Sequence, residues 1–363
     1  MDLIYEYWFA SITHVSERKK YLLREQLGTG KHIFYIEETK LRQQRFLNEA
    51  DISMIRQAQK WTNLEERFED LKRNSIRFVP HFSETFPKKL GEIPSPPYAL
   101  YVKGKLPKED KKSVAIVGAR RCTPYGEKYA LEYGEKLARC GVHIISGLAK
   151  GIDGLGQRGA LMGGGQTFSV LGCGVDICYP KEHLGLYHDI LEKGGGILSE
   201  FVPGTSPLPQ NFPKRNRIIS GLSDVVLVME AREKSGSLIT ADMALEQGRD
   251  VYALPGPVDN SLSQGCNHLI RQGAGILLSP EMLLEELQIS GGFEMLKTDK
   301  NKKVLETTEN MVYSRLGLYP RNVSQLIEET SLSANEVMEL LVSLELKGYI
   351  REVSKNYYVK LKE

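Results

Sequence analysis

Residues 113–121 read Ser-Val-Ala-Ile-Val-Gly-Ala-Arg-Arg, a run of small and apolar residues that ends in a glycine and two cations. A short apolar run that stops at a turn is typical of a strand buried on both faces. Amphipathic segments such as Glu127–Arg139 and Leu238–Gly248 alternate with further runs of this kind. Those runs are Val142–Ser146, Thr167–Leu171, Gly196–Ser199, Val225–Val228, Val251–Leu254 and Ile276–Leu278. The alternation predicts an α/β domain with an extended Rossmann-like parallel sheet that helices cover on both faces.

The segments on either side of this alternating region differ from it in composition. Residues 1–75 place apolar residues at helical spacing, which predicts a helical, SAM-like module. The predicted α/β domain covers residues 76–290, and two short runs, Ile76–Pro80 and Tyr98–Val102, are expected to add strands to one edge of its sheet. The polar residues 291–303 predict a linker.

Residues 304–363 have the pattern of a winged helix, with three helices followed by a hairpin. The helices are expected near Glu309–Leu316, Val323–Glu329 and Ala334–Lys347. The third helix would be the one that reads DNA, yet it carries Glu336, Glu339 and Glu345. Because phosphates repel such a helix, we expect protein contact or an autoregulatory role in preference to duplex reading.

Composition narrows the class of protein. The 48 basic and 46 acidic side chains nearly balance, so attraction for a polyanion must come from local clusters of charge. The five cysteines are scattered without a Cys-x-x-Cys pair, which favours neither a disulfide framework nor a zinc site. The sequence starts without the pattern of a signal peptide, and no apolar run approaches the ~20 residues of a membrane span. These features predict a cytoplasmic protein with no membrane contact.

Cations and hydrogen-bond donors gather in the loops that follow the predicted strands. Arg120 and Arg121 follow the first strand, and Lys150 follows the second. Another predicted helix, whose N-terminus would favour an anion, starts beside Ser235, Gly236 and Ser237. Because the carboxyl ends of parallel strands meet at one edge of a sheet, these loops are expected to converge on one rim.

The stretch 212–217 is the strongest candidate for contact with a polyanion. It is expected to form a basic turn before a helix that starts near Ile218. Cations neutralise phosphates, an amide can bond a base edge, and a ring can stack on an unpaired base. The candidate side chains are Phe212, Lys214, Arg215, Asn216 and Arg217.

The sequence does not favour a dinucleotide site. That fingerprint needs G-x-G-x-x-G after the first strand and an acidic residue at the end of the second. After Val117 the chain reads Gly-Ala-Arg-Arg-Cys-Thr, and the second strand ends in Ser146-Gly147 without a carboxylate. We therefore expect no bound cofactor and no metal site.

Five stretches of the sequence, taken together, can be compared with known families. They are residues 114–120 (Val-Ala-Ile-Val-Gly-Ala-Arg), 146–153 (Ser-Gly-Leu-Ala-Lys-Gly-Ile-Asp), 212–220 (Phe-Pro-Lys-Arg-Asn-Arg-Ile-Ile-Ser), 235–240 (Ser-Gly-Ser-Leu-Ile-Thr) and 251–256 (Val-Tyr-Ala-Leu-Pro-Gly). Together they closely resemble the DNA-processing protein A (DprA/Smf) family. The resemblance covers the whole predicted sheet domain, and the flanking modules match the family's usual additions less closely.

The resemblance implies a cytoplasmic bacterial recombination mediator without catalytic activity. Such proteins bind incoming single-stranded DNA, form homodimers through the sheet domain and load the RecA recombinase during natural transformation. Arg121 and Lys214 are cations beyond the family's commoner pattern. The resemblance places DNA contacts on Arg120, Phe212, Arg215, Asn216 and Arg217.

An enzymatic alternative comes from the nucleoside-monophosphate phosphoribohydrolases, whose fold this domain also resembles. Those enzymes need a Pro-Gly-Gly-x-Gly-Thr-x-x-Glu loop with a catalytic Glu. Here residues 234–242 read Lys-Ser-Gly-Ser-Leu-Ile-Thr-Ala-Asp, so the double glycine and the Glu are missing. Asp242 lies one residue away from the position at which it could plausibly substitute for that Glu.

Overall fold

The computed structural model describes residues 3–289, 307–316, 320–330 and 332–361. The chain divides into two compact units, residues 1–296 and residues 297–363. The linker predicted at 291–303 lies outside the described residues. Among the described residues, no helix has both the length and the apolar character needed to cross a membrane.

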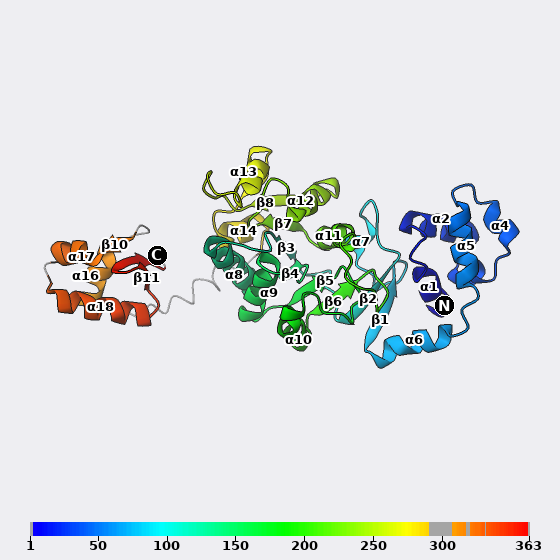
Figure 1. Ribbon diagram of the computed structural model, residues 1–363, viewed down its shortest axis with the longest axis horizontal. Helices are drawn as coiled ribbons and strands as arrows, with labels where there is room; N and C mark the ends of the chain where they lie inside the picture. Colours follow the sequence, from blue (N-terminus) through cyan, green and yellow to red (C-terminus); the bar gives the residue numbers. More distant parts are fainter. Residues whose placement is uncertain (1–2, 290–306, 317–319, 331, 362–363) are drawn as a thin grey trace. The chain divides into compact units, whose positions relative to one another are not determined.

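A nine-stranded sheet organises the first unit, in the order β1-β2-β6-β5-β4-β3-β7-β8-β9 (Figure 1). All neighbouring pairs from β6 to β9 are parallel, which confirms the predicted parallel sheet. The two expected edge strands are also present, although β2 pairs antiparallel with β6 and β1 antiparallel with β2. The strands are β1 (Ile76–Pro80), β2 (Ala99–Gly104), β3 (Ser113–Val117), β4 (His143–Ser146), β5 (Thr167–Val170), β6 (Gly196–Ser199), β7 (Val225–Val228), β8 (Asp250–Ala253) and β9 (Gly275–Ile276).

Helices cover both faces of this sheet, as the alternating pattern predicts. The helices are α7 (Lys88–Gly91), α8 (Pro124–Arg139), α9 (Ile152–Met162), α10 (Leu184–Glu192), α11 (Asn211–Gly221), α12 (Gly236–Glu246), α13 (Gln264–Arg271) and α14 (Pro280–Glu286). Because successive side chains of a strand point to opposite faces, Val114 and Ile116 join the core beneath α8 and α9. Ala115 and Val117 join the core beneath α11 and α12. Apolar side chains therefore cover both faces of the sheet, and its polar loops lie at the ends of the strands.

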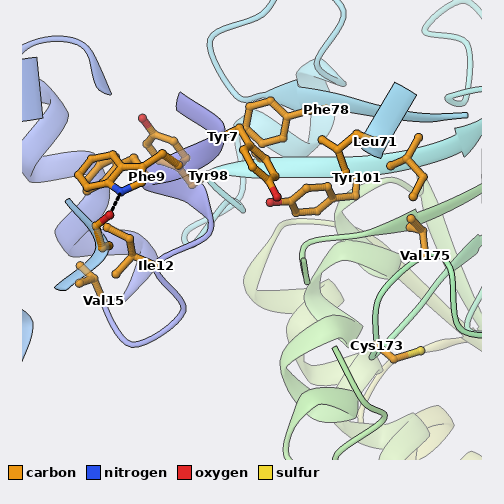
Figure 2. Packing of buried hydrophobic residues seen from close by; sticks show 14 of the residues in the cluster. Tyr7, Phe9, Ile12, Val15, Leu71, Phe78, Tyr98, Tyr101, Cys173 and Val175 are labelled. Carbon is orange, nitrogen blue, oxygen red and sulfur yellow. Dashed lines mark hydrogen bonds between the residues drawn. The ribbon is translucent and has the colours of Figure 1, made fainter. Parts of the chain in front are cut away.

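The N-terminal module is helical, as predicted, and packs on the edge of the sheet that β1 and β2 form. Its helices are α1 (Leu3–Ala10), α2 (Glu17–Leu27), α3 (Gly30–Phe34), α4 (Glu38–Arg42), α5 (Glu49–Ala58) and α6 (Leu64–Arg73). Tyr7 of α1 meets the rings of Phe78 and Tyr101 at centroid distances of 5.8 and 6.3 Å (Figure 2). The buried Glu6 accepts a hydrogen bond of 2.5 Å from the Tyr98 hydroxyl. Module and sheet edge thus share one core within the first unit.

The second unit has the predicted winged-helix layout. Its elements are α16 (Thr307–Arg315), β10 (Arg321–Asn322), α17 (Val323–Thr330), α18 (Ala334–Leu346), β11 (Ile350–Ser354) and β12 (Tyr357–Lys360). The strands form a small sheet in the order β10-β12-β11. Val312, Leu326, Val337, Leu341 and Ile350 belong to a separate hydrophobic core.

Candidate nucleic-acid interface

A cavity of about 450 Å³ opens beyond the carboxyl ends of the parallel strands. The strand order reverses here, because β4 follows β3 on one side of the sheet and β7 lies on the other. Open α/β sheets bind their ligands at such a reversal. The loops after β3, β4, β5, β6 and β7 all contribute to the cavity, which confirms that they converge. The predicted site residues among its lining are Arg120, Phe212, Arg215, Asn216, Ser235, Gly236 and Ser237.

The basic stretch 212–217 lies inside α11, which begins at Asn211. The prediction that it forms a turn before a helix near Ile218 is therefore wrong. Pro213 does not break the helix because it lies in the first turn, where its missing N–H costs no hydrogen bond. Since the stretch is helical, its side chains point in different directions and meet different surroundings.

Phe212 forms the aromatic part of the cavity wall. Its ring lies 5.5 Å from the ring of Tyr179 and 5.6 Å from the guanidinium carbon of Arg120. A Cβ atom at Gly172 would lie only 2.9 Å from the Phe212 ring, so the glycine after β5 leaves room for it. Tyr179 and the exposed Arg120 complete a group of two rings and one cation. Such a group can stack on a base and neutralise its phosphate.

Arg215 is buried, with 4% of its surface exposed. Its Nη1 atom donates a hydrogen bond of 3.0 Å to the carbonyl of Gly147 and another to the carbonyl of Val170. The neighbouring Asp153 accepts a hydrogen bond of 3.1 Å from the Gly147 amide. Burial raises the pKa of Asp153, and the positive charge of Arg215 opposes this shift. Arg215 thus holds the loop after β4 against the end of β5.

Arg217 and Lys214 of α11 share the carboxylate of Glu200, which follows β6. Arg217 is 8% exposed and donates two hydrogen bonds, of 3.1 and 2.6 Å, to Glu200. The Nζ atom of Lys214 is 3.8 Å from the same carboxylate, and 48% of the lysine side chain is exposed. Of these two cations, Lys214 is the one that solvent reaches.

The N-terminus of α12 supplies hydrogen-bond donors to the cavity. The Ser235 hydroxyl accepts from the Ser237 amide at 3.3 Å and lies 2.7 Å from the Ser237 hydroxyl. Asn216 joins this segment to α11, since its amide donates to the Gly236 carbonyl at 3.2 Å. The N-terminus of this eleven-residue helix favours negative charge.

Four predicted cations do not line the cavity: Lys214 and Arg217, which face Glu200, and also Arg121 and Lys150. Arg121 is exposed beside Arg120 on the loop after β3. Lys150 forms an ion pair of 2.6 Å with Glu182, and both side chains are more than half exposed. Surface pairs of this kind contribute only ~0–1 kcal/mol, so a phosphate could compete for Lys150.

Sequence reasoning missed the buried Glu230, which anchors the turn that carries Arg120. Glu230 is 1% exposed and accepts hydrogen bonds from the Thr123 amide at 2.8 Å and the Thr123 hydroxyl at 2.5 Å. Thr123 in turn caps α8. The turn between β3 and α8 is therefore fixed at both ends, by the sheet and by this carboxylate.

Two carboxylates of this region, Asp153 and Asp242, line different cavities. Asp153 is the one carboxylate among the described residues that line the central cavity, and it is buried against Gly147 and Arg215. Asp242 of α12 lines a different cavity, together with Glu233 and His268.

Helix α18 of the winged helix exposes acidic side chains, in contrast to the cations at the rim of the sheet. Its exposed residues include Glu336, Glu339 and Glu345, together with Met338 and Val342. The capping residue Ser333 forms a capping box with Glu336. Lys347, just after the helix, forms an ion pair with the buried Glu309.

Comparison with known proteins assigns the chain to a family. The model of the family described as DNA recombination-mediator protein A matches residues 77–288. The chain belongs to this family. Its members are DNA-processing recombination mediators, which confirms the family resemblance of the sequence. A second model, described as the DprA winged helix domain, matches residues 297–354.

Individual relatives agree with this assignment. Protein Smf of Escherichia coli K12 is 38% identical over 315 residues, which are 84% of each chain. DNA processing protein DprA of Streptococcus pneumoniae R6 is 43% identical over 212 residues, 58% of this chain and 74% of the relative.

Two solved structures share the fold. The X-ray structure of DprA from Streptococcus pneumoniae has a TM-score of 0.68 at 33% identity, and the match covers 78% of this chain and 97% of that one. DprA from Helicobacter pylori, described for its unique single-stranded DNA binding mode, has a TM-score of 0.53 at 31% identity. That match covers 59% of this chain and 95% of the other.

Proposed function

We propose that this protein binds single-stranded DNA along the carboxyl-end rim of its sheet and acts as a recombination mediator in natural transformation. The observation that carries the proposal is the cavity in which the Phe212 ring meets the Arg120 guanidinium beside the N-terminus of α12. A ring stacks on a base that has no partner strand, and the cation and helix N-terminus favour phosphate. The similarity to the Helicobacter pylori protein supports this ligand.

The predicted site residues take different parts in this proposal. Phe212 stacks on a base, and the Asn216 amide lies close enough to the same cavity to bond a base edge. Phosphates are held by the donors of the α12 N-terminus and by the accessible cations Arg120, Arg121, Lys150 and Lys214. Arg215 and Arg217 hold the rim in shape, because each reaches a phosphate only if it leaves its present partners.

Binding measurements with three ligands test the proposal. Fluorescence anisotropy should show tight binding of a single-stranded oligonucleotide, weaker binding of a duplex of the same length and weak binding of a mononucleotide. Equal affinity for single strand and duplex would remove the role of base stacking. Preference for the mononucleotide would favour the related nucleotide-processing enzymes.

We also propose that the protein binds DNA without cleaving nucleotides, since Asp153 is engaged in the cavity wall and Asp242 lies outside it. Incubation with AMP or CMP should release no free base. Base release that Asp242→Ala abolishes would overturn this proposal.

A homodimer formed by the sheet domain is the next part of the proposal. Strand β9 is an outer strand of the sheet, and its Ile276 and the following Leu278 and Met282 are 47%, 63% and 45% exposed. Exposed apolar residues on a free sheet edge favour pairing with a second copy. Light scattering of the whole chain should show a dimer that Leu278→Glu converts to a monomer. A monomer at tens of micromolar without any substitution would contradict this.

The protein partner that we propose is the RecA recombinase, in the cytoplasm. Family membership supports this part. RecA should assemble faster on DNA that carries this protein than on DNA coated by a single-strand binding protein alone. Unchanged assembly at a saturating concentration of the protein would contradict loading.

A further inference from the structure

A second open cavity, of about 480 Å³, lies at the same end of the sheet. It is formed by the start of α8, which follows β3, and by the loop that follows β8. It has no lining residue in common with the central cavity. Its lining consists of Thr123, Pro124, Tyr125, Pro255, Gly256, Pro257 and Asn260.

The aromatic wall of this second cavity is fixed in place. The Tyr125 hydroxyl donates a hydrogen bond of 2.7 Å to the carbonyl of Pro255. The Tyr129 ring meets the Tyr125 ring edge to face at 4.8 Å. Tyr125 is still 37% exposed, so solvent reaches the ring. Burial raises the pKa of Tyr125 to about 12. A neutral ring held this way is suited to a flat, uncharged partner.

Two exposed cations lie within four residues of Tyr125 in the sequence, and an amide side chain lines the same cavity. Arg121 is exposed two residues before Thr123, and Lys128 is exposed with its Nζ atom 5.0 Å from the Tyr129 ring. Asn260 accepts a hydrogen bond of 3.0 Å from the Leu262 amide through Oδ1, which leaves its Nδ2 group as a donor. The combination of a ring, a donor and flanking cations is the chemistry that recognises a nucleotide of a single strand.

We propose that this cavity is a second base-binding subsite, in which a base stacks on Tyr125 while Arg121 and Lys128 neutralise the flanking phosphates. The inference rests on the proposed function, because it assigns the continuation of the same strand. Arg120 belongs to the central cavity and Thr123 to the second one. Arg120 and Tyr125 are five residues apart, which span at most about 18 Å, and a stacked strand advances ~3.4 Å per nucleotide. A strand held at Arg120 thus reaches Tyr125 within about five nucleotides.

Proline faces beside a tyrosine would also fit a proline-rich peptide. The exposed cations on the adjoining turn favour a polyanion over such a peptide, and the position at the same end of the sheet as the central cavity favours DNA. The affinity for DNA therefore decides between them.

The experiment uses the whole chain and two oligonucleotides, the shortest that binds and one about six nucleotides longer. Tyr125→Ala should lower the affinity for the longer one by roughly 5- to 150-fold, the range for loss of one base–aromatic stack, and leave the short one unchanged. Tyr125→Phe should bind both almost as the unsubstituted protein does. Tyr35→Ala, which removes an exposed ring of the helical module, is the matched control.

A second variant avoids any effect on the start of α8. Because Arg121 and Lys128 are both exposed, the double substitution to Ala should fold normally. It should reduce the salt dependence for the longer oligonucleotide by about 1.4, twice the value of ~0.7 per phosphate. A base analogue that fluoresces less when stacked, placed along the strand, should report two stacked positions, of which Tyr125→Ala removes one.

Wild-type affinity of both Tyr125→Ala and the double variant for the longer oligonucleotide would overturn the inference. The proposed function would survive that result as long as the short oligonucleotide bound and Phe212→Ala weakened it. Failure of the unsubstituted protein to bind single-stranded oligonucleotides of any length would overturn the proposed function, and this inference with it.

Discussion

The rim of the sheet and helix α18 of the winged helix each lie where their folds present a surface to DNA in other proteins. The rim combines rings and cations, with the exposed Arg120 beside the Phe212 ring and the exposed Lys214 near Glu200. Helix α18 exposes glutamates and apolar side chains in their place. The difference teaches that a fold supplies a position for a ligand, whereas the side chains at that position decide which ligand binds.

The same lesson applies within α11. Arg215 and Arg217 are four and six residues from the start of the helix, yet both are engaged with protein partners. Lys214, directly before Arg215, has a side chain that is 48% exposed. Neighbouring cations in the sequence therefore divide into those that build the rim and those that are available to DNA.

The largest effect expected from the comparison is the loss of fold stability in Arg215→Ala. Removal of the guanidinium leaves two buried carbonyl groups without their donor and takes away the positive charge beside the buried Asp153. We expect the free energy of unfolding to fall by about 3–5 kcal/mol in urea denaturation. Lys214→Ala is the control and should change it by less than about 0.5 kcal/mol. Equal stability of the two variants would show that Arg215 does not build the rim.

The next effect concerns the ring at the centre of the rim. Phe212→Ala should weaken single-strand binding by about 1–3 kcal/mol through loss of stacking, and leave duplex binding almost unchanged. Anisotropy titrations with both ligands measure this. Phe212→Leu keeps an apolar side chain without a ring and should lose nearly as much. Full affinity in Phe212→Leu would mean that burial of apolar surface, and not stacking, holds the base.

A smaller effect separates the cations of the rim from those of the winged helix. Arg120→Ala should reduce the slope of log affinity against log salt by about 0.7, the single-strand value for one phosphate, on every sequence tested. Lys347→Ala is the control beside α18, where the lysine already pairs with Glu309. An unchanged slope for Arg120→Ala together with a reduced slope for Lys347→Ala would reverse the roles of the two regions.

The smallest effect is expected when the winged helix is removed. Deletion of residues 304–363 should change the affinity for single-stranded DNA by less than tenfold, because α18 repels phosphate and its unit has a core of its own. Circular dichroism of the truncated protein shows whether it is folded. A greater loss in a folded truncation would place part of the DNA on the winged helix.

Most of the sheet could be predicted from the sequence because its strands are buried on both faces. Val114 to Val117 and Val225 to Val228 are continuous apolar runs, which a solvated loop does not tolerate. The outer strand was harder to predict. Ile276–Leu278 was expected, and β9 forms at Gly275–Ile276, since a strand paired on one side has fewer partners to fix its ends.

The sequence was sufficient to predict which loops form the site, but not which role each side chain has in it. The loops converge because parallel strands share one end, which is a property of the fold that sequence order reveals. The stretch 212–217 was expected to be a turn, whereas it is helical, and the first turn of α11 tolerates Pro213. The partners of Arg215 and Arg217 come from segments distant in sequence, Gly147 and Glu200, so their burial depends on tertiary packing. Tyr179 was not among the predicted site residues. The signal that could have indicated it is its position, as an aromatic residue in the loop after β5.

Photo-crosslinking of a single-stranded oligonucleotide to the whole chain tests the central claim most directly. A strand with photoreactive bases at every position is bound, irradiated and digested, and the crosslinked peptides are identified by mass spectrometry. We predict crosslinks in the segments that form the rim, at residues 118–123 and in α11, above all at Phe212. Crosslinks confined to α18, within Ala334–Leu346, would contradict the account.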